Sequence, residues 1–322
     1  MPLQHYIPAA FLANFSASIK SPRRESFISV GDKLTGKCFT TSVSKVAAVQ
    51  DLYTLFSIHD SLHVDNWMGD YESHLVSALD DLINDNLSAL TWASVLVPFI
   101  AGFLVRGPDF DSRFTDRFRK KMGEFFVSEY ETLRGKPFSD NINLARIRER
   151  IDLLAPIMAA KWILLETNSS APLIINDLGY IGMKGGYIEK GLLTDIGPVF
   201  PIGTSHLLAI IPQPRRKVAV EKSGRWFPII ERNKLIKDNH IGFNTLAGTY
   251  ARRFIFGPNE DVVNQNLIKD EESLSNAIPE PNQLGFIYRG SQAAIGIEWN
   301  NVLDTLAKPP KSRGTWVRVD LT

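Results

Sequence analysis

The stretch ALTWASVLVPFIAGFLV, residues 89–105, is the part of the sequence that says most about the fold. Apart from Thr91 and Ser94 it is apolar. Ser88, a residue type that caps helix N-termini, precedes it, and the helix-stopping sequence Arg-Gly-Pro follows at 106–108. It falls short of the roughly 20 residues that a bilayer span needs. We therefore predict a helix buried on most sides within a layer of helices, and no association with a membrane.

Helical spacing of apolar residues continues on both sides of this stretch. The pattern predicts helices over residues 65–84, 88–105, 111–133 and 141–165, joined by short links. Successive helices with short links form a layer or a bundle. Residues 64–166 are therefore predicted to form a central layer of three to four helices.

Strand signals lie before and after the helical layer. Residues 26–30 and 37–41 alternate in polarity around a turn sequence at 31–36, which predicts a hairpin within a small N-terminal part, residues 1–60. Further strands are predicted at 173–176, 199–202, 206–211, 284–288, 294–298 and 316–319, with a helix over 234–254 and a short one near Asp261. This order predicts an α+β fold, in which residues 171–322 form a mixed sheet with one or two helices. We expect residues 1–322 to form one unit.

Composition limits the classes of function. The chain has 36 basic and 35 acidic residues, so it lacks the basic excess of a protein that coats nucleic acid or binds membrane surfaces. Cys38 is the single cysteine, which excludes an intramolecular disulfide and a thiolate metal cluster. The first residues lack the basic and apolar regions of a signal peptide. We expect a soluble, cytoplasmic protein.

The opening sequence Gln4-His5-Tyr6-Ile7-Pro8, followed by Asn14-Phe15, resembles the N-terminal signature of the bacterial family called domain of unknown function 4238. Members begin with a Gln-His-Tyr-Val-Pro motif. Further similar blocks are Asp51-Leu52-Tyr53, Tyr71-Glu72, residues 104–108, residues 173–177, where Leu-Gly follows in place of the family's Asn-Pro, residues 200–202, and residues in the late helix. The likeness spans most of residues 3–256. The resemblance implies a bacterial or phage-borne cytoplasmic protein. It implies no particular activity, because the function of the family is unknown.

Four residues in these family-like blocks are candidates for catalysis: His5, Asp51, Glu72 and Asp177. Imidazole titrates near neutral pH and can act as a general base. Carboxylates from separate elements, Asp51 and Glu72 above all, would hold Mg²⁺ or Mn²⁺ and activate water against a phosphodiester. The alternative is structural: His5 bonds a neighbouring strand, Asp51 caps a turn, Glu72 pairs with a basic residue, and Asp177 organises a turn.

Basic residues supply a second set of candidates. Arg106, Arg113 and Arg117 are predicted to bind phosphate, and Lys120 and Lys121 continue the same helical stripe. Equally, Arg106 can offset a helix dipole, and such stripes are often solvated helix faces. The sequence HDSLH at 59–63 has the histidine spacing of a zinc helix, with Asp in place of Glu.

Three hypotheses about function stay open. The first is a metal-dependent phosphodiesterase or nuclease that acts on nucleic acid, in phage defence or as a toxin-like effector. The second is a non-enzymatic sensor or binding module for a nucleotide, a nucleic acid or a phage protein. The third is a transferase that acts on a nucleotide-derived substrate. No Walker A sequence, no Gly-x-Ser-x-Gly elbow and no Glu-x-Lys or Asp-x-Lys tripeptide occurs, which argues against those classes of enzyme.

Overall fold

The apolar stretch forms a continuous helical rod in the computed structural model of the chain. The model describes residues 3–56, 69, 71–167, 172–183, 197–211, 216–220, 226–235, 239–267 and 319–321. The rod consists of α4 (Ala89–Thr91), a π-helical turn η4 (Trp92–Leu96) and α5 (Val97–Arg106). Ser88 Oγ accepts a hydrogen bond from Thr91 N at 3.0 Å, as expected of an N-cap. By length and composition Ala89–Arg106 could cross a membrane, but 83% of it is buried inside the protein, so it is a core helix.

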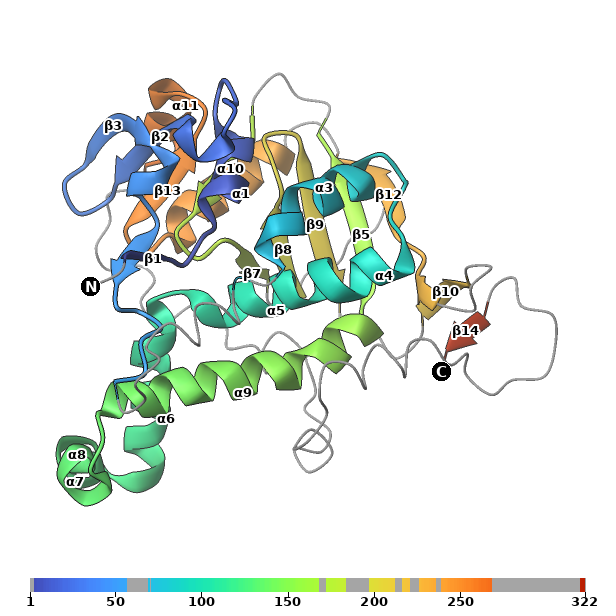
Figure 1. The fold of residues 1–322 in the computed structure, drawn as a ribbon. Helices are drawn as coiled ribbons and strands as arrows, with labels where there is room; N and C mark the ends of the chain where they lie inside the picture. Colours follow the sequence, from blue (N-terminus) through green and yellow to red (C-terminus); the bar gives the residue numbers. More distant parts are fainter. Residues whose placement is uncertain are drawn as a thin grey trace.

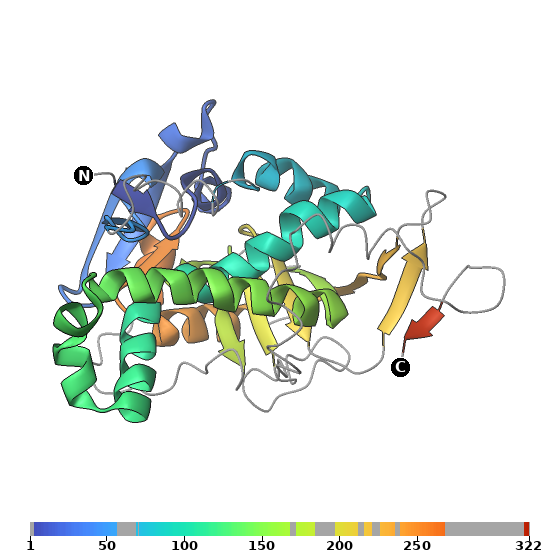
Figure 2. The ribbon, with the colours of Figure 1, turned by 60° about the horizontal axis from the view of Figure 1, so that its bottom comes forward.

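Helices packed around the rod form the predicted helical layer (Figure 1). α5 lies along α9 (Phe138–Ala159), and α3 (Glu72–Ile83) packs against η4. Three further helices, α6 (Asp109–Met122), α7 (Glu124–Ser128) and α8 (Tyr130–Arg134), extend away from the rest of the molecule and form the helical arm (Figures 1 and 2). The sequence predicted one helix over 111–133. This was wrong, because Gly123 takes a φ of 91° and ends α6.

A five-stranded sheet has the strand order β12-β5-β9-β8-β7. Its inner strands alternate between two apolar cores: Trp162 and Leu164 of β5 join the core that contains α5, whereas Ile163 and Leu165 join the core that contains Phe243 of α10. The helical layer and α10 therefore cover opposite faces of this sheet. The bounds are β5 Lys161–Glu166, β7 Ile181–Met183, β8 Gly197–Pro201, β9 His206–Ile211, β12 Glu231–Lys234 and α10 Asn239–Tyr250.

Strand β5 overturns part of a sequence prediction. The helix predicted over 141–165 ends as α9 at Ala159, and residues 161–166 are a strand. Because β5 is buried on both faces, Trp162–Leu165 is a continuous apolar run, which periodicity cannot tell from the end of a helix. The helix predicted over 234–254 is likewise shorter, because α10 ends at Tyr250.

A second sheet has the order β3-β2-β13-β6. Strands β2 (Phe27–Asp32) and β3 (Lys37–Ser42) confirm the predicted hairpin, and β13 (Phe254–Gly257) pairs antiparallel with β2. β6 (Ile175–Asn176) completes this sheet, and α11 (Glu260–Gln265), the short helix expected near Asp261, packs against β2. The α+β fold class is therefore confirmed.

Smaller elements complete the described chain. They are β1 (Leu3–His5), which pairs with β4 (Ala48–Gln50); α1 (Ala9–Leu12); the 3-10 turns η1 (Ala13–Phe15), η2 (Arg23–Glu25) and η3 (Val43–Lys45); and β10 (Arg216–Val220) between β11 (Trp226–Pro228) and β14 (Val319–Leu321). The predicted strands at 284–288 and 294–298, residues 59–63 and most of 316–319 lie outside the described residues.

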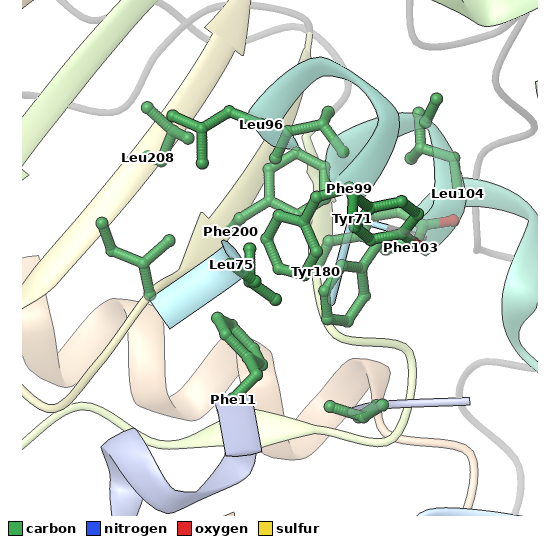
Figure 3. Packing of buried hydrophobic residues seen from close by; sticks show 14 of the residues in the cluster. Phe11, Tyr71, Leu75, Leu96, Phe99, Phe103, Leu104, Tyr180, Phe200 and Leu208 are labelled. Carbon is green, nitrogen blue, oxygen red and sulfur yellow. The ribbon is translucent and has the colours of Figure 1, made fainter. Parts of the chain in front are cut away.

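An aromatic cluster ties the N-terminus to the helical rod (Figure 3). The ring of Phe11 lies 5.0 Å from that of Phe99 and 5.3 Å from that of Phe103, in edge-to-face contacts. Phe103 also meets Phe200 of β8 at 6.1 Å. Such contacts add specificity to apolar burial. The first residues of the chain are thereby fixed against the end of α5, where the family-like motifs gather.

Candidate functional site

The guanidinium group of Arg106, at the end of α5, is the centre of a buried polar cluster. It is 3% exposed. Its Nη1 donates to Glu72 Oε1 and, at 3.2 Å, to the Tyr71 hydroxyl; its Nε donates to the Tyr53 hydroxyl at 3.3 Å. Burial lowers the pKa of Arg106, but Glu72 and then the two tyrosines outweigh it and hold that pKa well above the usual value. Arg106 is therefore a permanent cation whose side-chain partners come from two segments of the chain.

The same arginine holds the N-terminal signature. Its Nη2 donates to the His5 carbonyl oxygen at 2.7 Å, and the Gln4 side-chain oxygen accepts from Tyr53 N at 2.6 Å. The His5 ring donates from Nε2 to the carbonyl of Ser44 at 3.2 Å. The signature therefore fastens β1 to the end of α5 and to the segment before β4.

A second arginine closes the end of α5. Arg146 of α9 is fully buried, and its Nη1 donates to the carbonyl oxygens of Val105, Arg106 and Gly107 at 2.8–3.2 Å. Its Nη2 pairs with Asp111. Helix C-termini expose carbonyl groups that need donors. Arg146 supplies those donors, so it has a structural role.

Asp177 lies in a separate backbone cradle. Its two carboxylate oxygens accept the backbone N–H groups of Arg252, Arg253 and Phe254 at 2.7–3.0 Å. The Arg253 side chain turns to Asp32, with Nη2 and Oδ2 3.0 Å apart. Burial raises the pKa of Asp177 to about 6, although the three backbone hydrogen bonds act to lower it. A carboxyl with that pKa changes charge close to neutral pH.

Tyr6, the third residue of the signature, connects the two clusters electrostatically. Burial raises its pKa, and the charge of Asp177 raises it further, with smaller effects from Tyr53, Arg253 and Asp109. The charge of Asp109 likewise raises the pKa of Asp177. Tyr6 of the N-terminal signature and Asp109 after the Arg-Gly-Pro sequence are therefore both coupled electrostatically to Asp177.

The residues of both clusters lie in the part of the chain that matches a known protein family. The family described as "Protein of unknown function (DUF4238)" matches residues 3–265. The chain belongs to the DUF4238 family. No curated protein and no solved structure matches it. The resemblance predicted from the opening motif is thus confirmed, and the matched region includes every residue of the two clusters.

In this DUF4238 protein the predicted catalytic residues do not form one site. Glu72 and the His5 backbone meet at Arg106, Asp177 lies in its own cradle, and Asp51 sits in a turn at φ 55° where its carbonyl accepts Thr54 N at 3.2 Å. Among the described residues, no three His, Cys, Asp or Glu side chains are placed to share a metal ion. The predicted Mg²⁺ or Mn²⁺ site at Asp51 and Glu72 therefore gains no support from the geometry.

The predicted phosphate-binding arginines contact protein groups. Arg113 is 9% exposed and donates from Nε to Asp109 at 2.9 Å, and Arg117 pairs with Glu149 at 2.6 Å while staying 40% exposed. With Arg106 buried, only Arg117 of the three has a substantially exposed side chain. The dipole-offsetting alternative for Arg106 fits this position at the end of α5.

Sequence reasoning gave no role to several residues that build the DUF4238 clusters. Gln4, Tyr53 and Tyr71 stood inside the family-like blocks, but nothing in the sequence indicated that they bond to Arg106. Asp109 follows directly after the Arg-Gly-Pro sequence. Arg146 lies four residues before Arg150, a spacing that is typical of a solvated basic helix face. The sequence does not show that Arg146 is buried. Its burial would have indicated a structural role, because an arginine that is fully buried must have acceptors around it.

Proposed function

We propose that this protein is a non-enzymatic binding module that recognises a nucleic acid. The observation that supports the proposal is that the Nε, Nη1 and Nη2 atoms of Arg106 each donate to a protein acceptor in a buried cluster. Glu72 is its counter-ion, and the Asp177 oxygens already accept three backbone N–H groups. Side chains engaged in this way stabilise a fold, and they are poorly placed to bind a metal or a transferred phosphate group.

A metal-dependent nuclease is the second candidate, and one observation favours it. Asp177 has a pKa of about 6, which suits a general acid or base near neutral pH. The charge of Asp109 contributes to this raised pKa, and the charge of Asp177 in turn raises the pKa of Tyr6. This candidate requires a metal or a water molecule to reach Asp177.

One experiment separates the two candidates. Wild-type protein, His5→Ala and Asp177→Asn are incubated with labelled single- and double-stranded DNA and RNA in Mg²⁺, in Mn²⁺ and in chelator. His74→Ala is the matched control, because the His74 side chain is exposed on α3 and only its backbone N–H contacts the Arg106 cluster, at the Tyr71 carbonyl oxygen. We expect complexes on native gels in every buffer, with the nucleic acid intact. Metal-dependent cleavage that His5→Ala abolishes and His74→Ala keeps would instead establish the nuclease.

A role in defence against phage is a prediction that belongs to this proposal. Its test is the plating efficiency of phage on cells that express the wild type or Arg106→Met. Because Arg106 holds the N-terminal signature, its loss is expected to remove any protection together with the folded protein.

A further inference from the structure

The helical arm is held together by its own aromatic core. Phe118 lies 6.1 Å from Phe114 and 5.3 Å from Phe138, and Tyr130 lies 5.1 Å from Phe138 (centroid distances). These rings come from α6, α8 and the start of α9, so they fix the arm as a rigid projection beside α9 (Figure 2).

A second pair of aromatic rings lies outside that core. Phe125 is 64% exposed and Phe126 is 42% exposed, and their rings meet edge to face at 5.8 Å. Met122 and Leu133 of the same arm are also exposed, at 41% and 53%. Grouped apolar side chains on the surface of a soluble protein usually mark a binding site.

Positive charge adjoins these rings. The last turn of α6 carries Arg119, Lys120 and Lys121. Arg119 is neutralised by Asp116 and Glu124. Lys120 and Lys121 are exposed and form no ion pair within the part of the chain that the structure describes. Among the described residues, Lys120 and Lys121 are therefore two cations without a counter-ion. They precede the two exposed rings by about one helical turn in the sequence.

We propose that residues 120–126 at the tip of the arm bind single-stranded nucleic acid. In this inference, which rests on the proposed function, Phe125 and Phe126 stack on unpaired bases while Lys120 and Lys121 contact the phosphates between them. Unpaired bases expose the flat faces that aromatic rings need, whereas a duplex hides them.

The test is fluorescence anisotropy of the full-length chain with labelled oligo-dT, oligo-U and a DNA duplex over a range of salt concentrations. We expect the single strands to bind more tightly than the duplex. Phe125→Ala with Phe126→Ala should raise the Kd about tenfold or more, the effect of losing one or two stacked bases. Lys120→Ala with Lys121→Ala should reduce the slope of log K against log salt by about 1.4, the release of counterions from two phosphates.

The controls are matched in chemistry and lie on or directly after the hairpin of the second sheet. Phe27→Ala with Phe39→Ala removes two exposed rings, and Lys37→Ala with Lys45→Ala removes two exposed cations. Both should bind like the wild type. Circular dichroism verifies that each variant is folded.

The outcomes distinguish this inference from the proposed function. If the wild type and both arm variants bind the single-stranded oligonucleotides with the same Kd, the arm is not the binding surface. The proposal of a nucleic-acid-binding module would then still hold. Binding of no oligonucleotide at any salt would overturn both. In that case, capture by anionic vesicles that is lost in the Phe125→Ala, Phe126→Ala variant would assign the tip to a membrane surface.

Discussion

Replacing Gly179 by alanine should be among the most damaging single-methyl changes in this protein. Gly179 follows the Asp177 turn with a φ of 80°, and its N–H donates to the Asn176 carbonyl at 3.0 Å. A Cβ there would overlap the Cε1 and Cδ1 atoms of Phe103 and lie 3.1 Å from its Cζ. Phe103 cannot move aside, because it is 3% exposed and packed between Phe11 and Phe200 (Figure 3).

The expected loss has two parts. A left-handed conformation costs an alanine about 1–2 kcal/mol. Forcing an extra carbon into a packed core costs about 1–3 kcal/mol more. The free energy of unfolding of Gly179→Ala should therefore fall by about 2–5 kcal/mol. With a urea m-value of roughly 3 kcal/mol/M, the denaturation midpoint drops by about 1 M.

Two other glycines serve as controls in the same urea titrations followed by circular dichroism. Gly135 also has a positive φ, 67°, but no atom lies within 4 Å of the position that a Cβ would take, so Gly135→Ala should lose only the backbone part, about 1 kcal/mol. Gly242 lies in α10 with equally open space, and Gly242→Ala should gain about 0.5–1 kcal/mol. A loss for Gly179→Ala no larger than that for Gly135→Ala would refute the argument from Phe103.

Three further changes test the two polar clusters. Glu72→Ala should lower the free energy of unfolding by about 3 kcal/mol, because it leaves the buried Arg106 charge without its counter-ion, and Glu72→Gln by less; unchanged urea midpoints would contradict a structural role. Tyr53→Phe removes the hydroxyl that donates to the Arg106 carbonyl at 3.0 Å and should cost about 1–2 kcal/mol in the same assay. Because Asp177 has a folded pKa of about 6, above its unfolded value, its contribution to stability is present below about pH 4 and is lost as pH rises through 6. The stability of the wild type relative to Asp177→Asn should therefore fall by about 2 kcal/mol from about pH 4.5 to pH 7, and a pH-independent difference would show that the carboxyl does not titrate there.

Much of the fold could be predicted from local patterns. The cap at Ser88, the apolar run to Val105 and the alternating hairpin strands each encode their element in a few neighbouring residues, and all three predictions are confirmed. Strand β5 could not be recognised, because burial on both faces removes the alternation that marks a strand. Its identity depends on β9 and β12, which lie far along the chain.

The sequence indicated some members of the polar clusters, but neither their partners nor their roles. The family-like blocks contain His5, Glu72, Arg106 and Asp177, yet a sequence cannot show which charged groups neutralise each other. Arg106 illustrates the difficulty, because an arginine that binds phosphate and one that binds Glu72 look alike until burial is known. The turn after Asp177 is a clearer case. Where the family pattern has Asn-Pro, this chain has Leu-Gly, and Gly179 takes a φ that proline cannot adopt.

The pairing of β13 with β2 has a consequence for how the chain is made. Strand β2 gains its second neighbour only when residues 254–257 are available, although β2 itself ends at Asp32. At roughly 5–20 residues per second, a ribosome needs about 10–45 s to add the residues between them. During that time the N-terminal hairpin has an open edge, which is a template for pairing with other chains. Newly synthesised protein is therefore most vulnerable to aggregation before β13 emerges, and a chain that terminates before residue 254 keeps that vulnerability permanently.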